Sequence, residues 1–278
     1  AKLPQPFIVG CDFAGTIEMV GPEVEGLAVG QRVWGSNQGL LGRQGTFAER
    51  IAVGAEWVYP TPEGVSDQTA AAAALVAITA HLGLVREAQV QPGETLFVNG
   101  GTGGVGSMVV QMAKLLGARV ITTAGSEEKL AICRQYGADL AINYRTSDVS
   151  EEVRAFAPAG VNVWWETLRQ ADFAQTFDLL APRGRMVVMA GRDARPEFPV
   201  GPFYLNELRV MGFVMFKAPS DAQRRAADQI NQWLGEGKLD VPIGATFPLD
   251  QAAAAHQLQE DNTLHGAGTV RGKIVVTV

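Results

Sequence analysis

The stretch that decides the fold is Thr95–Gly106, TLFVNGGTGGVG. A short apolar strand runs into Gly101-x-Gly103-x-x-Gly106, and the amphipathic sequence SMVVQMAKLLGA continues as a helix. In this spacing Gly101 allows the tight turn, Gly103 leaves room for a pyrophosphate, and Gly106 lets the helix pack close to the strand. The free N–H groups at the helix start then face the phosphates. The stretch predicts a dinucleotide-binding unit, with an ordinary strand-to-helix turn as the alternative.

Strands and helices alternate on the carboxyl side of this stretch. Strands are expected in RVITTA, LAINY, VNVWWET and RMVVMAG, and helices in SEEKLAICRQYG, DVSEEVRAFA and ADFAQTFDLLA. Such alternation is typical of an α/β fold with a doubly wound parallel sheet. The apolar run LRVMGFVMF is expected to form a further long strand at or near the edge of this sheet, with a helix over 221–234 after it.

Both ends of the chain have a different pattern. Residues 1–60 contain short alternating runs such as FAGTIEMVG, QRVWG and TFAERIAV, which predict an all-β module. Ser66 and Asp67 are expected to cap an Ala-rich helix. The terminal segments ATFPLD and KIVVTV are expected to rejoin the β-rich start. The predicted domains are therefore 1–74, 75–218 and 219–278, where the first and last form one domain.

Composition limits the functional classes. The chain has 278 residues, of which 47% are hydrophobic and 19% charged, so it can bury two ordinary cores. A net charge of −6 argues against nucleic acid or an anionic membrane as the main partner. The two cysteines have no metal-binding or disulfide spacing, which favours a cytoplasmic location. We identify no signal peptide or membrane span in the sequence. Because the chain opens in the middle of a strand-like pattern, we expect that a preceding segment is missing.

The motifs occur in an order that resembles a known superfamily. They are GCDFAGTIEMVGPEVEGLAVGQRV, GTFAERIAV, NGGTGGVG, AGSEEK, INYR and a closing RGKIVV. This order resembles the medium-chain dehydrogenase/reductase superfamily, and within it the zinc-free quinone oxidoreductases that include zeta-crystallin. The resemblance covers essentially the whole chain and implies a GroES-like β-rich catalytic domain with a Rossmann domain inserted in it. The family's first segment, which supplies part of the substrate pocket, has no counterpart here.

The zinc question depends on one tripeptide. Zinc-dependent members of the family carry Gly-His-Glu where this chain has Gly10-Cys11-Asp12. Cys11 is expected to be a buried thiol, with a role as zinc ligand as the alternative. The three histidines are scattered along the chain, and the cysteine-rich lobe of the zinc enzymes is absent. We therefore expect no metal and assign no residue with certainty to catalysis.

The choice of nicotinamide cofactor depends on the end of the second Rossmann strand. NAD-specific folds place a carboxylate there, whereas this chain has Thr123-Ala124-Gly125-Ser126. The hydroxyl of Ser126 and the charge of Lys129 suit a 2′-phosphate, and Tyr144 and Arg145 follow the next strand. The resemblance implies that Lys129 and Tyr144 contact this phosphate or the adenosine. These residues predict NADPH, although Glu127 and Glu128 count against it and each cation has a solvated surface role as its alternative.

Further cofactor contacts follow from strand ends and from the resemblance. The resemblance implies that Thr79 and a strand carrying Phe213 and Met215 meet the nicotinamide; a self-bonded helix hydroxyl and plain core packing are the alternatives. Residues after parallel strands are placed where ligands bind in open sheets. The full set of expected cofactor contacts is Thr79, Gly103, Gly104, Val105, Ser126, Lys129, Tyr144, Thr167, Gly191, Phe213, Met215 and Arg271.

These features predict an NADPH-dependent reductase of quinones or α,β-unsaturated carbonyls. Without a Lewis acid, the acceptor has to be electrophilic already, and the protein supplies orientation and a dry pocket. An enoyl-thioester reductase is the first alternative, and a catalytically idle NADPH-binding protein is the second. The resemblance and the apolar run LRVMGFVMF both predict a homodimer joined through the cofactor domains.

Overall fold

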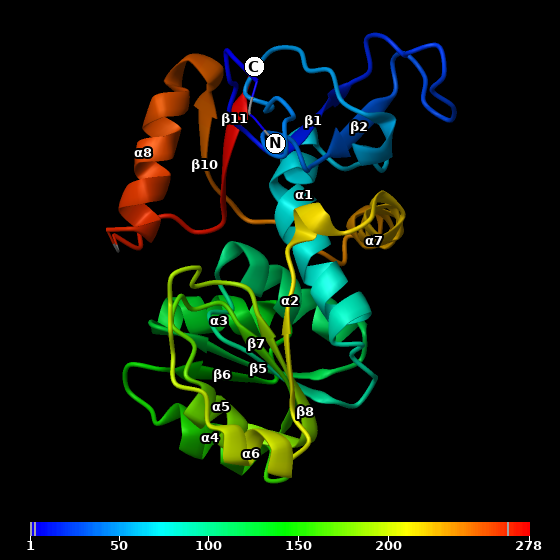
Figure 1. Cartoon of the computed structure of the whole chain (residues 1–278). Coiled ribbons are helices and arrows are strands. Elements are labelled where there is room, and N and C mark those ends of the chain that lie inside the picture. The colour runs from blue at the N-terminus through cyan, green and yellow to red at the C-terminus, as the bar shows by residue number, and fades with distance from the viewer. Residues whose placement is uncertain (1, 3, 266) are drawn as a thin grey trace. The chain divides into compact units, whose positions relative to one another are not determined.

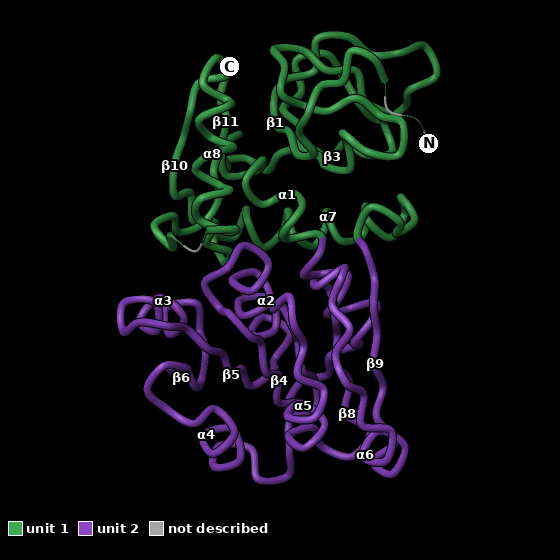
Figure 2. The backbone as a smooth tube through the Cα atoms, turned by 60° about the vertical axis from the view of Figure 1, so that its left-hand side comes forward, with its two compact units in different colours: residues 1–78, 215–278 green, residues 79–214 purple. Residues whose placement is uncertain are grey.

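The computed structural model describes residue 2, residues 4–265 and residues 267–278. The chain divides into two compact units, which Figure 2 distinguishes by colour. Unit 1 consists of residues 1–78 and 215–278, and unit 2 consists of residues 79–214. Unit 1 is therefore assembled from two separate stretches of the sequence, whereas unit 2 is one continuous stretch.

Unit 2 is built on a six-stranded parallel sheet with the order β6-β5-β4-β7-β8-β9. The strands are β4 (Thr95–Val98), β5 (Arg119–Ala124), β6 (Leu140–Asn143), β7 (Val161–Glu166), β8 (Leu180–Val188) and β9 (Arg209–Gly212). The strand order reverses between β4 and β7, and in such sheets ligands bind outside the carboxyl ends of the strands at this point. The predicted doubly wound parallel sheet is confirmed.

Helices cover both faces of this sheet. They are η2 (Leu82–Glu87, a π-helix), α2 (Gly104–Leu115), α3 (Glu127–Gln135), α4 (Val149–Phe156), α5 (Phe173–Leu179) and α6 (Val200–Leu205). In Figure 1, α2 and α3 lie above the sheet and α4 and α5 below it. The lower core contains Val153 of α4, Phe177 of α5 and the sheet residues Phe97 and Trp164. The rings of Phe97 and Trp164 stack with centroids 3.8 Å apart, so neighbouring strands are joined through their side chains as well as their backbones.

Unit 1 contains two small sheets. The antiparallel sheet has the order β1 (Phe13–Thr16), β2 (Arg32–Gly35) and β3 (Val58–Pro60), and the second pairs β10 (Ile243–Pro248) with β11 (Lys273–Thr277). Its helical segments are η1 (Ala55–Trp57), most of α1 (Asp67–His81), η3 (Met215–Lys217), α7 (Ser220–Gly235), η4 (Leu249–Gln251) and α8 (Ala252–Thr263). The indole of Trp34 donates a hydrogen bond of 2.8 Å to Asn231 of α7, which fastens the start of the chain to its end.

The Ala-rich helix begins as the sequence predicts. The Ser66 hydroxyl accepts a hydrogen bond of 3.1 Å from the Thr69 amide, which is an N-cap. The helical segment Asp67–Glu87 is also long and apolar enough to cross a membrane, but 72% of its most apolar window is buried inside the protein. Burial of this kind is typical of a core helix, so the segment is weak support for a membrane span.

Two expected strands differ from the structure. Residues 46–53, within the run TFAERIAV, lie outside the strands. The run LRVMGFVMF forms only the four-residue strand β9, and Met215 then starts the 3₁₀ turn η3. Phe213 and Met215 are therefore not strand residues. Alternation detects an extended apolar segment, but only a partner strand makes it part of a sheet.

Candidate cofactor site

The glycine-rich loop connects β4 to α2 at the point where the strand order reverses. Gly100 has a φ of +77° and makes the turn, so the role predicted for Gly101 belongs to its neighbour. A Cβ on Gly101 would lie 2.3 Å from Oγ1 of Thr122 on β5, and one on Gly106 would lie 2.2 Å from the carbonyl oxygen of Gly100. Both positions therefore require glycine, because a β5 side chain leaves no room at Gly101 and the loop backbone leaves none at Gly106.

Gly103 has a different environment. The atom nearest to its Cβ position is 3.5 Å away, which is ordinary contact, so this side of the loop is not crowded by protein. Gly103 is the N-cap residue of α2, and Gly104 and Val105 form the first turn. Amide groups in a first turn have no acceptor within the helix. The loop thus offers free N–H groups beside an open backbone, which fits a pyrophosphate.

Two further loops reach the same edge of the sheet. The Thr167 hydroxyl, directly after β7, donates a hydrogen bond of 2.6 Å to the carbonyl of Asn99. Gly191 follows β8 with a φ of +80°, and a Cβ there would lie 2.0 Å from the carbonyl oxygen of Arg169. The structure therefore places Thr167 against the glycine-rich loop, and Gly191 against the segment that follows Thr167.

The end of β5 carries the residues expected to select the cofactor. The Tyr144 hydroxyl lies 2.6 Å, and Nε of Arg145 lies 3.1 Å, from the Cβ position of Gly125. Neither Lys129 nor Arg145 forms an ion pair within the described part of the chain. Two cations and a phenol are thus available beside a strand end that has no carboxylate.

Two neighbours of these cations are already engaged. The Ser126 hydroxyl caps α3 by accepting a 3.4 Å hydrogen bond from the Lys129 amide. Glu127 accepts a 3.4 Å hydrogen bond from the side chain of Asn143. The Glu127 carboxylate is therefore held by Asn143, whereas Ser126 has a structural role in addition to its predicted one.

Unit 1 holds a large hollow of about 1430 Å³. Its lining includes Cys11, Asp12, Thr46 and Lys273. The Asp12 carboxylate accepts a 2.6 Å hydrogen bond from Ser36, and the Lys273 ammonium lies 3.8 Å away. Burial raises the pKa of Asp12, although Lys273 and Ser36 act in the opposite direction. This hollow therefore combines apolar walls with one buried carboxyl group.

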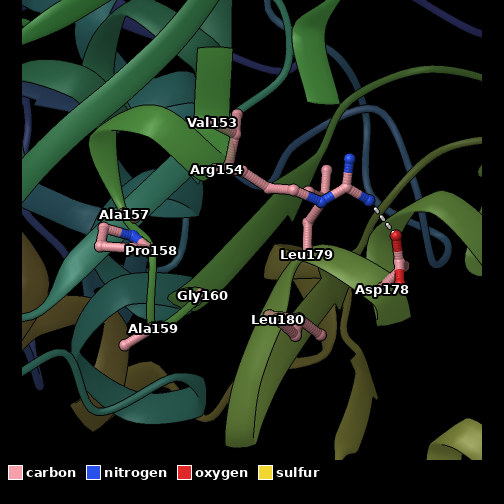
Figure 3. Close-up of a pocket in the computed structure, with 9 residues that line it drawn as sticks. All are labelled: Val153, Arg154, Ala157, Pro158, Ala159, Gly160, Asp178, Leu179 and Leu180. Atoms are coloured by element: carbon pink, nitrogen blue, oxygen red, sulfur yellow. Dashed lines mark hydrogen bonds and ion pairs between the residues drawn. The ribbon is translucent and has the colours of Figure 1, made fainter. Parts of the chain in front are cut away.

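A second hollow, of about 200 Å³, lies in unit 2 at the start of β8 (Figure 3). The figure shows the Arg154 guanidinium paired with the Asp178 carboxylate beside it. The other lining residues are apolar or glycine. Because its two charged side chains neutralise each other, the lining offers no unpaired charge to a ligand.

Comparison with known proteins identifies the superfamily. Residues 104–273, more than half of the chain, match the family described as zinc-binding dehydrogenase. Residues 1–63 match the alcohol dehydrogenase GroES-like domain. The chain belongs to the medium-chain dehydrogenase/reductase superfamily. Among curated relatives, the quinone oxidoreductase of Homo sapiens is 29% identical over 272 residues, which is 98% of this chain and 80% of that protein. This similarity supports the quinone oxidoreductase branch of the superfamily.

Other members of the superfamily extend the range of activities. A phenolphthiocerol/phthiocerol polyketide synthase of Mycobacterium tuberculosis is 29% identical over 276 residues, which is 98% of this chain but 12% of that protein. A solved NAD-dependent alcohol dehydrogenase is 30% identical with a TM-score of 0.84, covering 99% of this chain and 84% of that one. A mycobacterial protein solved in complex with NADPH is 26% identical with a TM-score of 0.83, covering 98% and 83%. The superfamily fold is confirmed, and an oxidoreductase with a nicotinamide cofactor is supported.

Zinc, which the family description names, does not fit the described residues. They contain no group of three His, Cys, Asp or Glu side chains that could hold a metal ion. The Cys11 thiol lies 3.5 Å from the Ser36 hydroxyl, and burial and the neighbouring Asp12 raise its pKa. A thiol must lose its proton to bind a metal, so a raised pKa opposes zinc binding. Zinc independence stays a prediction with its own measurement.

The remaining candidates are placed as follows. Thr79 is buried near the end of α1, at 5% exposure, and belongs to unit 2. Phe213 packs edge-on against Trp165, with ring centroids 6.3 Å apart, which favours the core-packing alternative. Met215 and Arg271 belong to unit 1, so their contact with a cofactor stays a prediction. Asn99 and Glu166 were not among the predicted site residues, although each is a polar residue at the end of an apolar strand.

Proposed function

We propose that this protein is an NADPH-dependent reductase of quinones or α,β-unsaturated carbonyls that works without zinc. The observation that carries the proposal is the end of β5, where Lys129, Tyr144 and Arg145 are available and no carboxylate occupies the strand end. A 2′-phosphate carries about two negative charges and needs such partners. The ribose diol of NADH would instead favour a carboxylate acceptor.

Within unit 2, each group has a defined task. Gly104 and Val105 present backbone amides to the pyrophosphate, and Gly103, whose own amide donates to the Gly100 carbonyl, leaves room for it to approach. Lys129 and Arg145 neutralise the 2′-phosphate. Thr167 and Gly191 line the loops after β7 and β8 at the same edge. When bound, the nicotinamide supplies a hydride, so this chain has to orient the reactants and exclude water. The hollow of unit 1 is the proposed space for the apolar acceptor.

The proposal is tested by following the oxidation of NADPH and NADH with a small quinone, an enone and a crotonyl thioester. We expect turnover of the quinone or enone, faster at limiting NADPH than at limiting NADH. Treatment with a chelator should leave the rate unchanged, and elemental analysis should find no stoichiometric zinc. A preference for NADH, or about one zinc per chain, would contradict the corresponding part of the proposal.

One observation favours an enoyl-thioester reductase as the second candidate. The polyketide synthase relative matches nearly the whole of this chain within a small part of its own length. Reduction of the crotonyl thioester with little turnover of quinone would support this alternative. Tight NADPH binding without reduction of any of the three acceptors would instead favour a catalytically idle binding protein.

A further inference from the structure

A buried carboxylate lies beneath the proposed cofactor site. Glu166, the last residue of β7, is 2% exposed. Its Oε1 accepts a 2.7 Å hydrogen bond from the Leu168 amide, and its Oε2 accepts bonds of 3.2 Å from the Trp164 indole and 3.4 Å from the Asn99 amide group. Burying a carboxylate is costly unless hydrogen bonds compensate for the lost water. Three uncharged N–H donors provide that compensation here.

One of these donors opens the glycine-rich loop. Oδ1 of Asn99 accepts a 2.8 Å hydrogen bond from the Thr123 hydroxyl, which itself accepts a 3.0 Å bond from the Gly100 amide. The Asn99 carbonyl accepts a hydrogen bond from the Thr167 hydroxyl. Asn99 is therefore fixed at once by Thr123 of β5, by Glu166 at the end of β7 and by Thr167 just after it. Its orientation in turn sets the direction in which the chain enters the turn at Gly100.

A second donor belongs to another loop of the site. The Leu168 amide is held by Glu166 directly after Thr167. The next residue, Arg169, presents its carbonyl to Gly191 in the loop after β8. The two oxygens of one carboxylate thus join the loop after β4 to the loop after β7, and through it the loop after β8.

We propose that Glu166 is a positioning residue for dinucleotide binding, through its hold on the Asn99–Gly100 turn and the Thr167–Leu168 segment. The inference rests on the proposed function, since it requires that a dinucleotide binds at this edge. Binding is tighter when the loops are ordered before the ligand arrives, because less conformational entropy is lost on association. A glutamine at position 166 has only one acceptor oxygen, so at least one of the three donors would face an NH₂ group.

The test is Glu166→Gln, with dissociation constants for NADPH and NADH measured by calorimetric titration. Leaving a buried donor unsatisfied is expected to weaken both cofactors about tenfold. Lys129→Ala should affect NADPH alone, so the ratio of the two constants separates positioning from phosphate recognition. Glu94→Gln is the matched control, because Glu94 is a largely buried carboxylate of unit 2 at the opposite end of β4. It should lower the unfolding temperature and leave both constants unchanged.

A second variant keeps the test valid if Glu166→Gln does not fold. Thr123→Val preserves the shape of a buried β5 residue and removes the hydroxyl that joins Asn99 to Gly100. It should also weaken both cofactors by a similar factor. Unchanged constants in both variants, or in Thr123→Val alone where Glu166→Gln does not fold, would overturn the inference while the proposed function stands. If the unmodified protein binds neither cofactor, both the inference and the proposed function fail.

Discussion

Among single residues, Lys129 offers the sharpest test of cofactor choice. Its ammonium has no ion-pair partner in the described part of the chain and lies one helical turn after the Ser126 cap. A charge-assisted hydrogen bond contributes about 1.5–3 kcal/mol. Lys129→Ala should therefore weaken NADPH binding roughly ten- to hundredfold and leave NADH binding almost unchanged.

The matched control is Lys114→Ala. Lys114 also belongs to unit 2, but its ammonium is paired with Asp139 at 2.7 Å, near the start of β5. This variant should keep the wild-type ratio of the two dissociation constants. Equal losses of NADPH and NADH binding in Lys129→Ala would contradict the predicted role of its charge.

Asp12 is predicted to shape the pH dependence of stability. Burial raises its pKa above the ordinary value of 3.8, against the opposing effects of Lys273 and Ser36, and Cys11 is the other titratable neighbour. The folded state therefore holds this proton more tightly than the unfolded state does. The Asp12 contribution to the free energy of unfolding is thus greatest below the ordinary pKa and falls as the pH rises through the raised value.

Asp12→Asn keeps an acceptor for Ser36 and removes this titration. The free energy of unfolding, measured by urea titration at a series of pH values, should depend less steeply on pH above about 4 than in the wild type. Glu18→Gln removes an exposed carboxylate of the same unit and should leave the slope unchanged. If the free energy of unfolding of Asp12→Asn depends on pH as steeply as that of the wild type, Asp12 is not the group responsible for this pH dependence.

At the scale of elements, the π-helix η2 packs closely against β7 because Gly83 has no side chain. A Cβ on Gly83 would lie 2.1 Å from the ring of Trp165, which is fully buried and cannot move aside. Alanine would gain about 1 kcal/mol of helix propensity. Overpacking a core costs about 1–3 kcal/mol, and a 2.1 Å approach to a buried ring belongs at the upper end of that range. After the gain in propensity is subtracted, Gly83→Ala should lower the free energy of unfolding by roughly 2 kcal/mol.

Gly201 in α6 provides the control for this prediction. No atom lies within 4 Å of its Cβ position, so alanine meets open space. Gly201→Ala should raise stability by up to about 1 kcal/mol. Denaturant unfolding of both variants checks the pair, and a Gly83→Ala protein as stable as the wild type would disprove the packing argument.

Sequence patterns predicted the elements of unit 2 better than those of unit 1. Strands and helices of a doubly wound sheet have strong periodicity, and some of these helices begin at a capping residue, such as Ser126 before α3 and Asp148 before α4. Residues 46–53 also alternate, yet no partner strand pairs with them within the described residues. The edge run after Arg209 ends early because Met215 turns into η3.

Some residues of the candidate site could be predicted from the sequence, and others could not. The glycine spacing and the cations after β5 can be found in the sequence because each lies within one short continuous segment. Glu166 was missed because glutamate is usually exposed, and its burial depends on donors from β4, from β7 and from the segment after β7. The same limit explains why Gly100, rather than Gly101, makes the turn: only the backbone path shows which glycine has the positive φ.

For the whole molecule, we predict a homodimer joined through β9. In the described residues β9 pairs with β8 on one side only, and Val214 just after it is 41% exposed. An uncovered edge strand invites pairing with another chain. Light scattering at micromolar concentration should therefore give twice the chain mass of 29.6 kDa.

Met211→Lys tests the interface directly. A lysine on an edge strand opposes pairing, so this variant should shift the protein toward the monomer. Met19→Lys, at a residue of unit 1 that is 84% exposed, should leave the mass unchanged. A monomeric wild type at micromolar concentration would rule out the dimer.

The division of the chain into one continuous and one split unit has a consequence for biosynthesis. A ribosome completes residues 79–214 while the second half of unit 1 has not yet been translated. At about 5–20 residues per second, the partners of Trp34 and Asp12, which are Asn231 and Lys273, are translated roughly 8–40 seconds after the first stretch. During that interval residues 1–78 lack their closing segments and expose apolar surface to chaperones. Unit 2 has no such delay, so the nascent chain matures from its middle outward.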